Sequence, residues 1–289
     1  MSPAEERLRA EICEVGRRLY ARGYVASNDG NISVRLDEGR ILATPTSVSK
    51  GFMTPDMMVI TDLSGQQIAG HRKASSELLM HLAVYEARPD VQAVVHAHPP
   101  MATGFAVAGI PLDRAVLAEV ITTLGSVPIA AYATPSTAEL PAAVRRFVPA
   151  HDGMLLANHG ALTVGRDLMN AYYKMETIEH FAHISLVARM LGAEHLISRE
   201  EVARLQALRD RYGIASPAGI CTEPTPPGDE PVSCQYVEAP ESTGERLVRT
   251  SPLPPPVLPA PGADGEIRLT YRELTALIAD AVRHVTGGR

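Results

Sequence analysis

The amino-acid sequence predicts an α/β fold of three layers, in which helices cover both faces of a mostly antiparallel central sheet. Two observations support this prediction. Short apolar segments alternate with longer segments of helical periodicity over residues 1–215. In addition, turns of only a few residues, at 37–39 and 158–160, separate some of the apolar segments, as antiparallel pairing allows.

The expected elements follow the chain in a regular order. The first helix, 4–22, carries the apolar residues Leu8, Ile12, Val15 and Leu19 at helical spacing, which is typical of an amphipathic surface helix. Short apolar runs bounded by turn residues predict strands at 31–36, 40–43, 58–61, 93–98, 129–131, 154–157 and 161–164. Apolar residues three and four apart predict further helices at 76–88, 99–108, 115–124, 137–148, 168–191 and 200–212.

Beyond residue 215 the composition changes. Residues 217–261 hold twelve of the 23 prolines, and proline fixes φ and removes a backbone donor. We therefore expect a disordered proline-rich linker over 216–266. Helical periodicity resumes in 267–289, where Thr270 and Glu273 have the spacing of a capping box, so a short amphipathic helix is expected there.

The overall composition excludes several classes of protein. The 289 residues carry a formal net charge of -6 with no basic patch, which argues against a nucleic-acid partner. The three cysteines lack the paired spacing of a zinc ribbon or disulfide scaffold, so a reducing cytoplasm is expected. No apolar run reaches membrane-spanning length, and the first residues do not have the pattern of a signal peptide.

Two histidines end one of the predicted strands. Residues 94–100 read VVHAHPP, and alternate residues of a strand point to the same side, so His96 and His98 present both imidazoles together. Neutral imidazole is a good ligand for Zn²⁺. A bare His-x-His is also common among polar surface residues, and the pair alone leaves that alternative open.

A third histidine, His159, lies in a tight turn between two apolar segments. Gly160 follows it, and we expect this glycine to let the backbone bend sharply. A third imidazole delivered beside the first two would complete a zinc site with an open fourth position. Without that pair, an ordinary hairpin histidine would be the better interpretation.

Small polar residues at element ends are candidates to bind an anion. Ser75 and Ser76 precede an apolar helical segment, and the free backbone N–H groups at the start of a helix favour the binding of phosphate. Glu77 in the first turn of that helix is a candidate general base, for which a pKa near neutrality is expected. Simple helix capping is the alternative. Two clusters of small, turn-forming residues, over 27–33 and 44–47, could supply further hydrogen-bond donors to an anion. Each cluster taken alone is more simply an ordinary turn. Their candidate residues are Gly30, Asn31, Thr46 and Ser47, with Lys50 as a further anion-binding candidate.

Taken together, these segments resemble the class II aldolase family, which includes fuculose-phosphate and rhamnulose-phosphate aldolases and ribulose-phosphate 4-epimerase. The order and spacing match at five places between residues 5 and 215, so the resemblance implies a catalytic domain of that fold over 1–215. The matching segments are Gly30-Asn31-Ile32-Ser33, Thr44-Pro45-Thr46-Ser47, Ser75-Ser76-Glu77, His96-Ala97-His98 and Asn158-His159-Gly160.

The resemblance implies a role for each matching residue. His96, His98 and His159 would bind Zn²⁺, and Glu77 would act as acid and base and also touch the metal. Tyr212 matches a C-terminal tyrosine that assists catalysis in the fuculose-phosphate enzyme. The substrate phosphate would lie against Gly30, Asn31, Thr46, Ser47, Ser75 and Ser76.

The implied activity is a lyase reaction in a homotetramer. A ketose 1-phosphate, such as L-fuculose 1-phosphate, would be cleaved to dihydroxyacetone phosphate and an aldehyde of the lactaldehyde type. One departure from the family is that the fuculose-phosphate enzyme has a tyrosine where this chain reads RAVLAE over 114–119, with Arg114 and Glu119 as candidate replacements. A sugar-phosphate epimerase or decarboxylase of the same fold, and a non-catalytic module like the adducin head, remain the alternatives.

The C-terminal segment lies outside the family pattern. A proline-rich linker followed by a short amphipathic helix resembles the encapsulation peptides of enzymes packaged in bacterial microcompartments. The resemblance implies shell proteins as partners through residues 269–286, and a cytoplasmic enzyme held inside such a compartment. A helix that docks back on its own enzyme, or that promotes oligomerisation, is the alternative.

Overall fold

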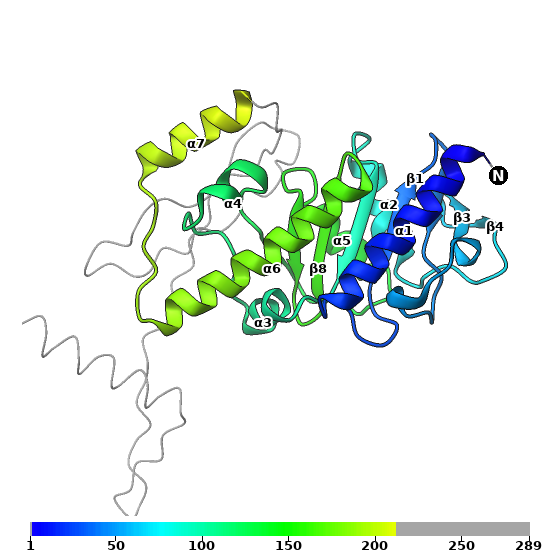
Figure 1. Cartoon of the computed structure of the whole chain (residues 1–289), viewed down its shortest axis with the longest axis horizontal. Helices are drawn as coiled ribbons and strands as arrows, with labels where there is room; N and C mark the ends of the chain where they lie inside the picture. The colour runs from blue at the N-terminus through cyan, green and yellow to red at the C-terminus, as the bar shows by residue number, and fades with distance from the viewer. Residues whose placement is uncertain (1, 212–289) are drawn as a thin grey trace, which may run out of the picture. The chain divides into compact units, whose positions relative to one another are not determined.

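A computed structural model of the protein describes residues 2–211 (Figure 1). Eight strands form one sheet in the order β4-β3-β2-β1-β5-β8-β7-β6. Every neighbouring pair is antiparallel except β6 and β7, which are parallel, so the expected mostly antiparallel sheet is confirmed. The strands are β1 Asn31–Arg35, β2 Arg40–Ala43, β3 Val59–Asp62, β4 Gln67–Ala69, β5 Ala93–Ala97, β6 Ile129–Ala130, β7 Gly153–Leu156 and β8 Gly160–Gly165.

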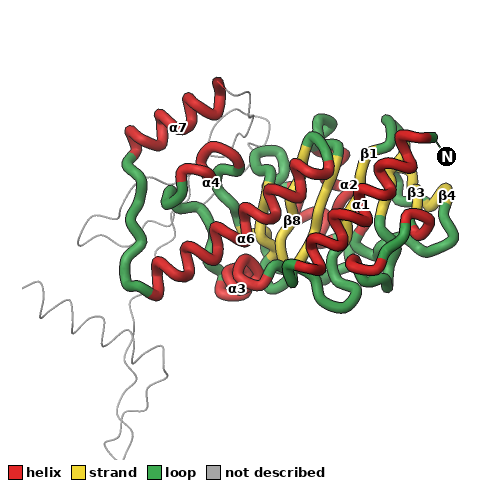
Figure 2. Tube along the Cα trace, viewed as in Figure 1, coloured by secondary structure: helices red, strands yellow, loops and turns green. Residues whose placement is uncertain are grey.

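Helices cover both faces of this sheet and complete the three layers (Figure 2). One face packs against α1, α3 and α6, and the other packs against α2 and α5. The helices are α1 Pro3–Ala21, α2 Leu78–Ala87, α3 Pro100–Ala108, α4 Ala118–Thr123, α5 Glu139–Arg145, α6 Leu168–Met190 and α7 Arg199–Arg211, with the short 3₁₀ helices η1 Lys50–Phe52 and η2 Pro55–Met57.

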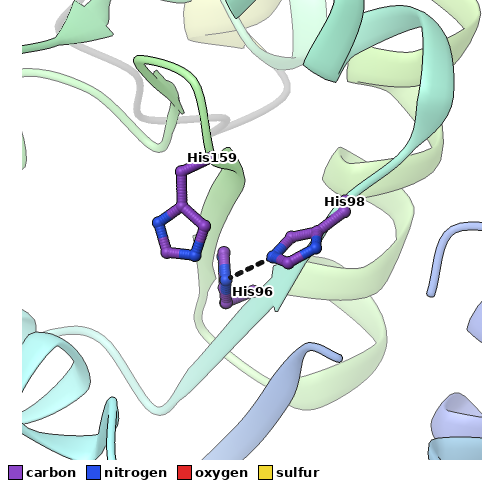
Figure 3. A group of neighbouring side chains, drawn as sticks. All are labelled: His96, His98 and His159. Atoms are coloured by element: carbon purple, nitrogen blue, oxygen red, sulfur yellow. Dashed lines mark hydrogen bonds between the residues drawn. The ribbon is translucent and has the colours of Figure 1, made fainter. Parts of the chain in front are cut away.

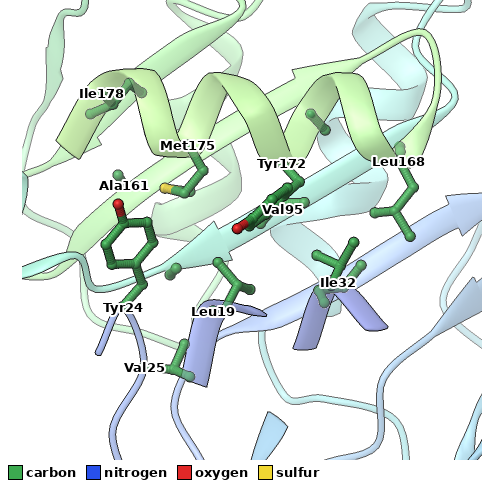
Figure 4. Close-up of a cluster of buried hydrophobic side chains, with 14 of the residues drawn as sticks. Leu19, Tyr24, Val25, Ile32, Val95, Ala161, Leu168, Tyr172, Met175 and Ile178 are labelled. Atoms are coloured by element: carbon green, nitrogen blue, oxygen red, sulfur yellow. The ribbon is translucent and has the colours of Figure 1, made fainter. Parts of the chain in front are cut away.

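Strand β5 runs through the centre of the sheet and is buried along its whole length. Its residues alternate between the two cores: Val95 packs in the cluster under α1 and α6, and Val94 packs in the cluster under α2 and α5. Figure 4 shows Tyr172 and Met175 of α6 in the first cluster, together with Leu19. The strand that ends at the histidine pair is therefore held rigidly from both faces.

The predictions that concern the chain beyond residue 211 lie outside the described residues. These are the linker over 216–266, the helix over 267–289 and the catalytic assignment of Tyr212. Between residues 2 and 211, every helix is too short or too polar to cross a membrane.

Candidate metal centre

Strand β5 and the residue after it present two imidazoles at the same place. His96 is fully buried and its Nδ1 donates to the carbonyl oxygen of Ala161 on the neighbouring strand β8, at 2.9 Å. His98 is the first residue beyond the strand, and its Nε2 lies 3.1 Å from Nε2 of His96 (Figure 3). The expectation that the two rings face the same side is confirmed.

The turn between β7 and β8 brings the third imidazole to this pair. The His159 ring centroid lies 4.7 Å from that of His96 and 5.1 Å from that of His98. The positive φ in this turn belongs to Asn158, at 54°, and not to Gly160, so the expected reason for the glycine is wrong. A Cβ on Gly160 would lie 2.5 Å from both Ala97 O and His98 Cδ2, so the glycine is required for close approach to the histidines.

The three side chains fit a divalent cation such as zinc. One nitrogen from each ring lies within 4.8 Å of the others. The 3.1 Å between the Nε2 atoms of His96 and His98 is close to the ligand separation of about 3.3 Å in a tetrahedral zinc site with Zn–N bonds near 2.0–2.1 Å. A backbone carbonyl accepts hydrogen bonds only, so Nδ1 of His96 carries the hydrogen and its Nε2 keeps the lone pair for a metal.

Burial favours the neutral form of these ligands. It is the main cause of the lowered pKa values of His96 and His98, and their like-charged neighbours lower them further. Nδ1 of His98 also lies 3.5 Å from Oδ2 of Asp29, a carboxylate that can orient the ring. A neutral, oriented imidazole is the form that coordinates zinc.

Glu77 places its carboxylate at the point where the Nε2 atoms converge. Oε1 lies 3.1 Å from Nε2 of His159, Oε2 lies 3.6 Å from Nε2 of His96, and Oε2 accepts a hydrogen bond of 2.8 Å from Nδ2 of Asn31. Burial acts to raise the pKa of Glu77, but the hydrogen bonds from His159 and from the amide of Asn31 act against it, and the pKa is lowered to about 2. The expectation of a pKa near neutrality is therefore wrong, and the group is a carboxylate at neutral pH.

The candidate anion-binding residues come from three loops beside this carboxylate. Gly30 has φ 72° and packs so closely on β5 that a Cβ would lie 2.8 Å from His96 O. Thr46 N donates to Lys73 O at 2.9 Å, and Ser75 N donates to Thr44 O at 3.3 Å, so the second and third loops run side by side. Helix α2 begins at Leu78 and not at Ser76, which leaves Ser76 in the turn before it and Glu77 at its N-cap.

The two candidate replacements for the family tyrosine occupy different surroundings. Arg114 pairs with Glu194 at 2.5 Å on the segment between α6 and α7. Glu119 lies in the first turn of α4 and lines a cavity that also includes Tyr24 and His180. Among residues 2–211, no hydrogen bond or ion pair joins Arg114 or Glu119 to the histidine cluster.

Two residues that support the site were not identified from the sequence. One is Asp29, for which the only signal is its place directly before Gly30 and Asn31. The other is Glu179 of α6, whose carboxylate accepts the backbone N–H groups of Met101 and Ala102 at 3.0 and 2.8 Å. These bonds satisfy the free donors at the start of α3 and fix the chain just after His98.

A comparison with known protein families agrees with the three-layer fold and the three converging histidines. The model of the family described as Class II Aldolase and Adducin N-terminal domain matches residues 10–186. The chain therefore belongs to that family.

Individual relatives include enzymes of two kinds. The chain is 35% identical to the L-fuculose phosphate aldolase of Methanococcus maripaludis over 63% of its own length and 97% of the relative's. It is 32% identical to the 3-oxo-tetronate 4-phosphate decarboxylase of Pectobacterium atrosepticum, over 64% and 86%. Among solved structures, L-fuculose-1-phosphate aldolase from Thermus thermophilus matches with a TM-score of 0.59 and 34% identity, over 66% of this chain and 99% of that one.

Proposed function

We propose that this protein is a zinc-dependent aldehyde-lyase that cleaves a ketose 1-phosphate, such as L-fuculose 1-phosphate, to dihydroxyacetone phosphate and an aldehyde of the lactaldehyde type. The observation that supports it best is the convergence of three imidazoles and one ionised carboxylate on a single point. His96, His98 and His159 would hold the metal, and Glu77 would touch it in the resting enzyme. The aldolase relatives support the same reaction type.

The chemistry needs a stabilised negative charge and a base. A bound zinc ion would act as a Lewis acid toward the charge that develops on the ketone oxygen when the bond between the carbon next to the ketone and the carbon beyond it breaks. In the synthetic direction, the ionised carboxylate of Glu77 would take a proton from the carbon next to the ketone of dihydroxyacetone phosphate. Cleavage is the reverse: the hydroxyl on the carbon that becomes the aldehyde loses its proton, the bond from that carbon to the one next to the ketone breaks, and Glu77 in its protonated form delivers a proton to the carbon next to the ketone.

The loops beside Glu77 would hold the phosphate. Gly30, Asn31, Thr46, Ser47, Ser75 and Ser76 would offer backbone N–H groups, hydroxyls and an amide to its oxygens. Asn31 connects the two functions because its Nδ2 already donates to Glu77 at 2.8 Å. Anchoring the phosphate there would fix the ketone relative to the carboxylate, which is how binding energy far from the reacting atoms lowers a barrier. Tyr212 stays a predicted catalytic residue.

A decarboxylase is the second candidate, and the relative from Pectobacterium atrosepticum favours it. Loss of carbon dioxide from a 3-oxo acid leaves the same kind of charge beside a ketone, so the same metal ligands would serve. The segment over 114–119, which lacks the tyrosine expected for the fuculose-phosphate enzyme, is consistent with either reaction. A sugar-phosphate epimerase remains the third reaction expected from the family resemblance.

Products distinguish these reactions. The zinc-loaded full-length protein would be incubated separately with L-fuculose, L-rhamnulose and L-ribulose phosphates and with a 3-oxo-tetronate 4-phosphate, and dihydroxyacetone phosphate, epimer and carbon dioxide would be measured. We expect dihydroxyacetone phosphate from at least one ketose 1-phosphate. Carbon dioxide from the 3-oxo acid, with no dihydroxyacetone phosphate from any sugar phosphate, would replace the proposed aldolase by the decarboxylase. A protein that lacks every activity and binds no metal would point to an adducin-head-like module.

The assembly and location of the enzyme are further proposals. We propose a homotetramer in the cytoplasm, held in a bacterial microcompartment through shell proteins that bind residues 269–286. Deleting 266–289 should leave activity intact and abolish association with shell proteins. Loss of activity in the truncated protein would instead indicate that this segment serves the enzyme itself.

A further inference from the structure

A buried lysine contacts two of the loops of the proposed phosphate site. Lys50, the first residue of η1, is only 1% exposed. Its Nζ donates to the backbone carbonyl of Asn28 at 2.9 Å and to that of Val48 at 2.7 Å. Removing an ammonium from water is costly unless its hydrogens find acceptors, so a lysine in this position needs a specific explanation.

These two carbonyls belong to different loops of the proposed phosphate site. Asn28 lies two residues before Gly30, and Val48 follows Ser47 directly. Each loop also contains a serine in the left-handed region, Ser27 with φ 49° and Ser47 with φ 57°. Such a conformation is unfavourable for a residue other than glycine and persists where the surroundings enforce it. The Lys50 ammonium is the group that joins both strained loops at one point.

Two carboxylates act on the charge of Lys50. Asp29 in the first loop and Glu77 at the start of α2 are the charged groups that act on it, and both favour its charged form. Helix α1 packs against η1 with Gly16, which lies against the Lys50 carbonyl, and with the ring of Tyr20, which lies against Gly51. Desolvation by burial nevertheless lowers the pKa of Lys50 to about 8, so its charge is held only weakly.

We propose that Lys50 is a positioning residue that holds the 27–31 and 46–49 loops in the shape that binds phosphate, and that its buried positive charge selects a dianion. This inference rests on the proposed phosphate site. A dianion seated between the two loops would stabilise the ammonium, and the ammonium would hold the donors of both loops toward the dianion.

Anion binding tests this inference without turnover. The zinc-loaded full-length protein would be titrated with inorganic phosphate at pH 7.5 and with sulfate from pH 6.5 to 9.5, because sulfate keeps the same charge over this range. Lys50→Met removes the two hydrogen bonds from the charged ammonium to the loop carbonyls. A hydrogen bond that involves a charged group contributes about 1.5–3 kcal/mol, so the variant should bind phosphate and sulfate at least about tenfold more weakly. Wild-type affinity for sulfate should fall as the pH rises through about 8, where Lys50 loses its proton.

Lys50→Arg is the matched variant, because it keeps a positive charge at every pH tested. We expect it to bind sulfate more tightly than Lys50→Met and to lack the decline above pH 8, while all three proteins hold the same amount of zinc. In the catalysed reaction, Lys50→Met should raise KM for a phosphorylated substrate more than it lowers kcat.

Three results would count against the inference. Unchanged sulfate affinity in Lys50→Met would overturn it. An unaltered pH dependence of sulfate binding in Lys50→Arg would also overturn it, and this second test can be used even when Lys50→Met does not fold. A wild-type protein that binds neither phosphate nor sulfate would overturn the proposed phosphate site itself. The first two results leave the proposed lyase reaction unaffected. A failure of the Lys50 inference can therefore be distinguished from a failure of the proposed function.

Discussion

Replacing Gly160 by alanine should damage the metal centre directly. The new Cβ would lie 2.5 Å from the carbonyl oxygen of Ala97, 2.5 Å from Cδ2 of His98 and 3.3 Å from Cε1 of His96. Ordinary contacts of a Cβ begin near 3.4 Å, so the overlaps approach 1 Å. The Ala97 carbonyl belongs to a strand buried on both faces, which leaves the His98 ring as the group that moves.

The size of the effect follows from this geometry. Overpacking of this kind costs roughly 1–3 kcal/mol of folding free energy. For a domain of this size, 1 kcal/mol corresponds to about 2–4 °C in Tm, so the loss of Tm in chelator should be roughly 2–12 °C. Metal sites tolerate changes of about 0.2 Å in ligand distance, so a ring displaced by several times that amount should weaken zinc binding at least about tenfold.

The assay combines thermal unfolding in chelator with zinc affinity measured by competition against a chelating dye. Gly104→Ala is the matched control, because Gly104 lies in α3 just after the histidine pair and its added Cβ would meet nothing within 4 Å. This control should gain roughly 0.5–1 kcal/mol of stability from helix propensity and keep wild-type zinc affinity. Wild-type zinc affinity in Gly160→Ala would show that this glycine is not needed to make room for the histidine ligands.

Three further substitutions test separate parts of the site and fold. Glu77→Gln should lower kcat by roughly 10²- to 10⁴-fold while the zinc content stays the same, and unchanged turnover would exclude Glu77 as the acid and base. Asp29→Asn should weaken zinc about tenfold through its contact with His98, and an unaltered affinity would show that the 3.5 Å contact does not orient the ring. Burial raises the pKa of Asp113 to about 6, above the value of about 3.9 in the unfolded chain. The folded state therefore binds the proton more tightly than the unfolded state, and the protein loses stability as the pH rises from about 4 to 6. Asp113→Asn should therefore exceed the wild type by roughly 1–3 kcal/mol at pH 8 and match it near pH 4, and a constant difference at both pH values would contradict this cause.

Local patterns were sufficient to predict much of the structure. The alternation of side chains along a strand predicted that His96 and His98 face one side, and the short turn between two apolar runs predicted the place of His159. Strand β4 was missed because Gln67, Ile68 and Ala69 are all exposed, so the strand carries no alternation of buried and exposed residues. Its pairing with β3 depends on the neighbouring strand rather than on its own sequence.

The errors at the site have a common physical cause, which is contact between residues that are far apart along the chain. The sequence indicates that a glycine is needed at position 160, but the reason is the approach of β5, which is far away along the chain. The bond from Glu179 to the start of α3 joins residues 77 and 78 positions apart, and no local pattern predicts such a contact. The pKa of Glu77 likewise depends on His159 and Asn31, which only the folded chain brings together.

The metal content of the purified protein is the most direct test of the proposed three-histidine metal centre. Elemental analysis of the full-length protein, prepared without chelator, should find one divalent ion per chain. His159→Ala, which removes one of the three converging imidazoles, should hold far less than one. A wild-type protein with no stoichiometric divalent metal, or a variant that still carries one ion per chain, would contradict the proposed metal centre.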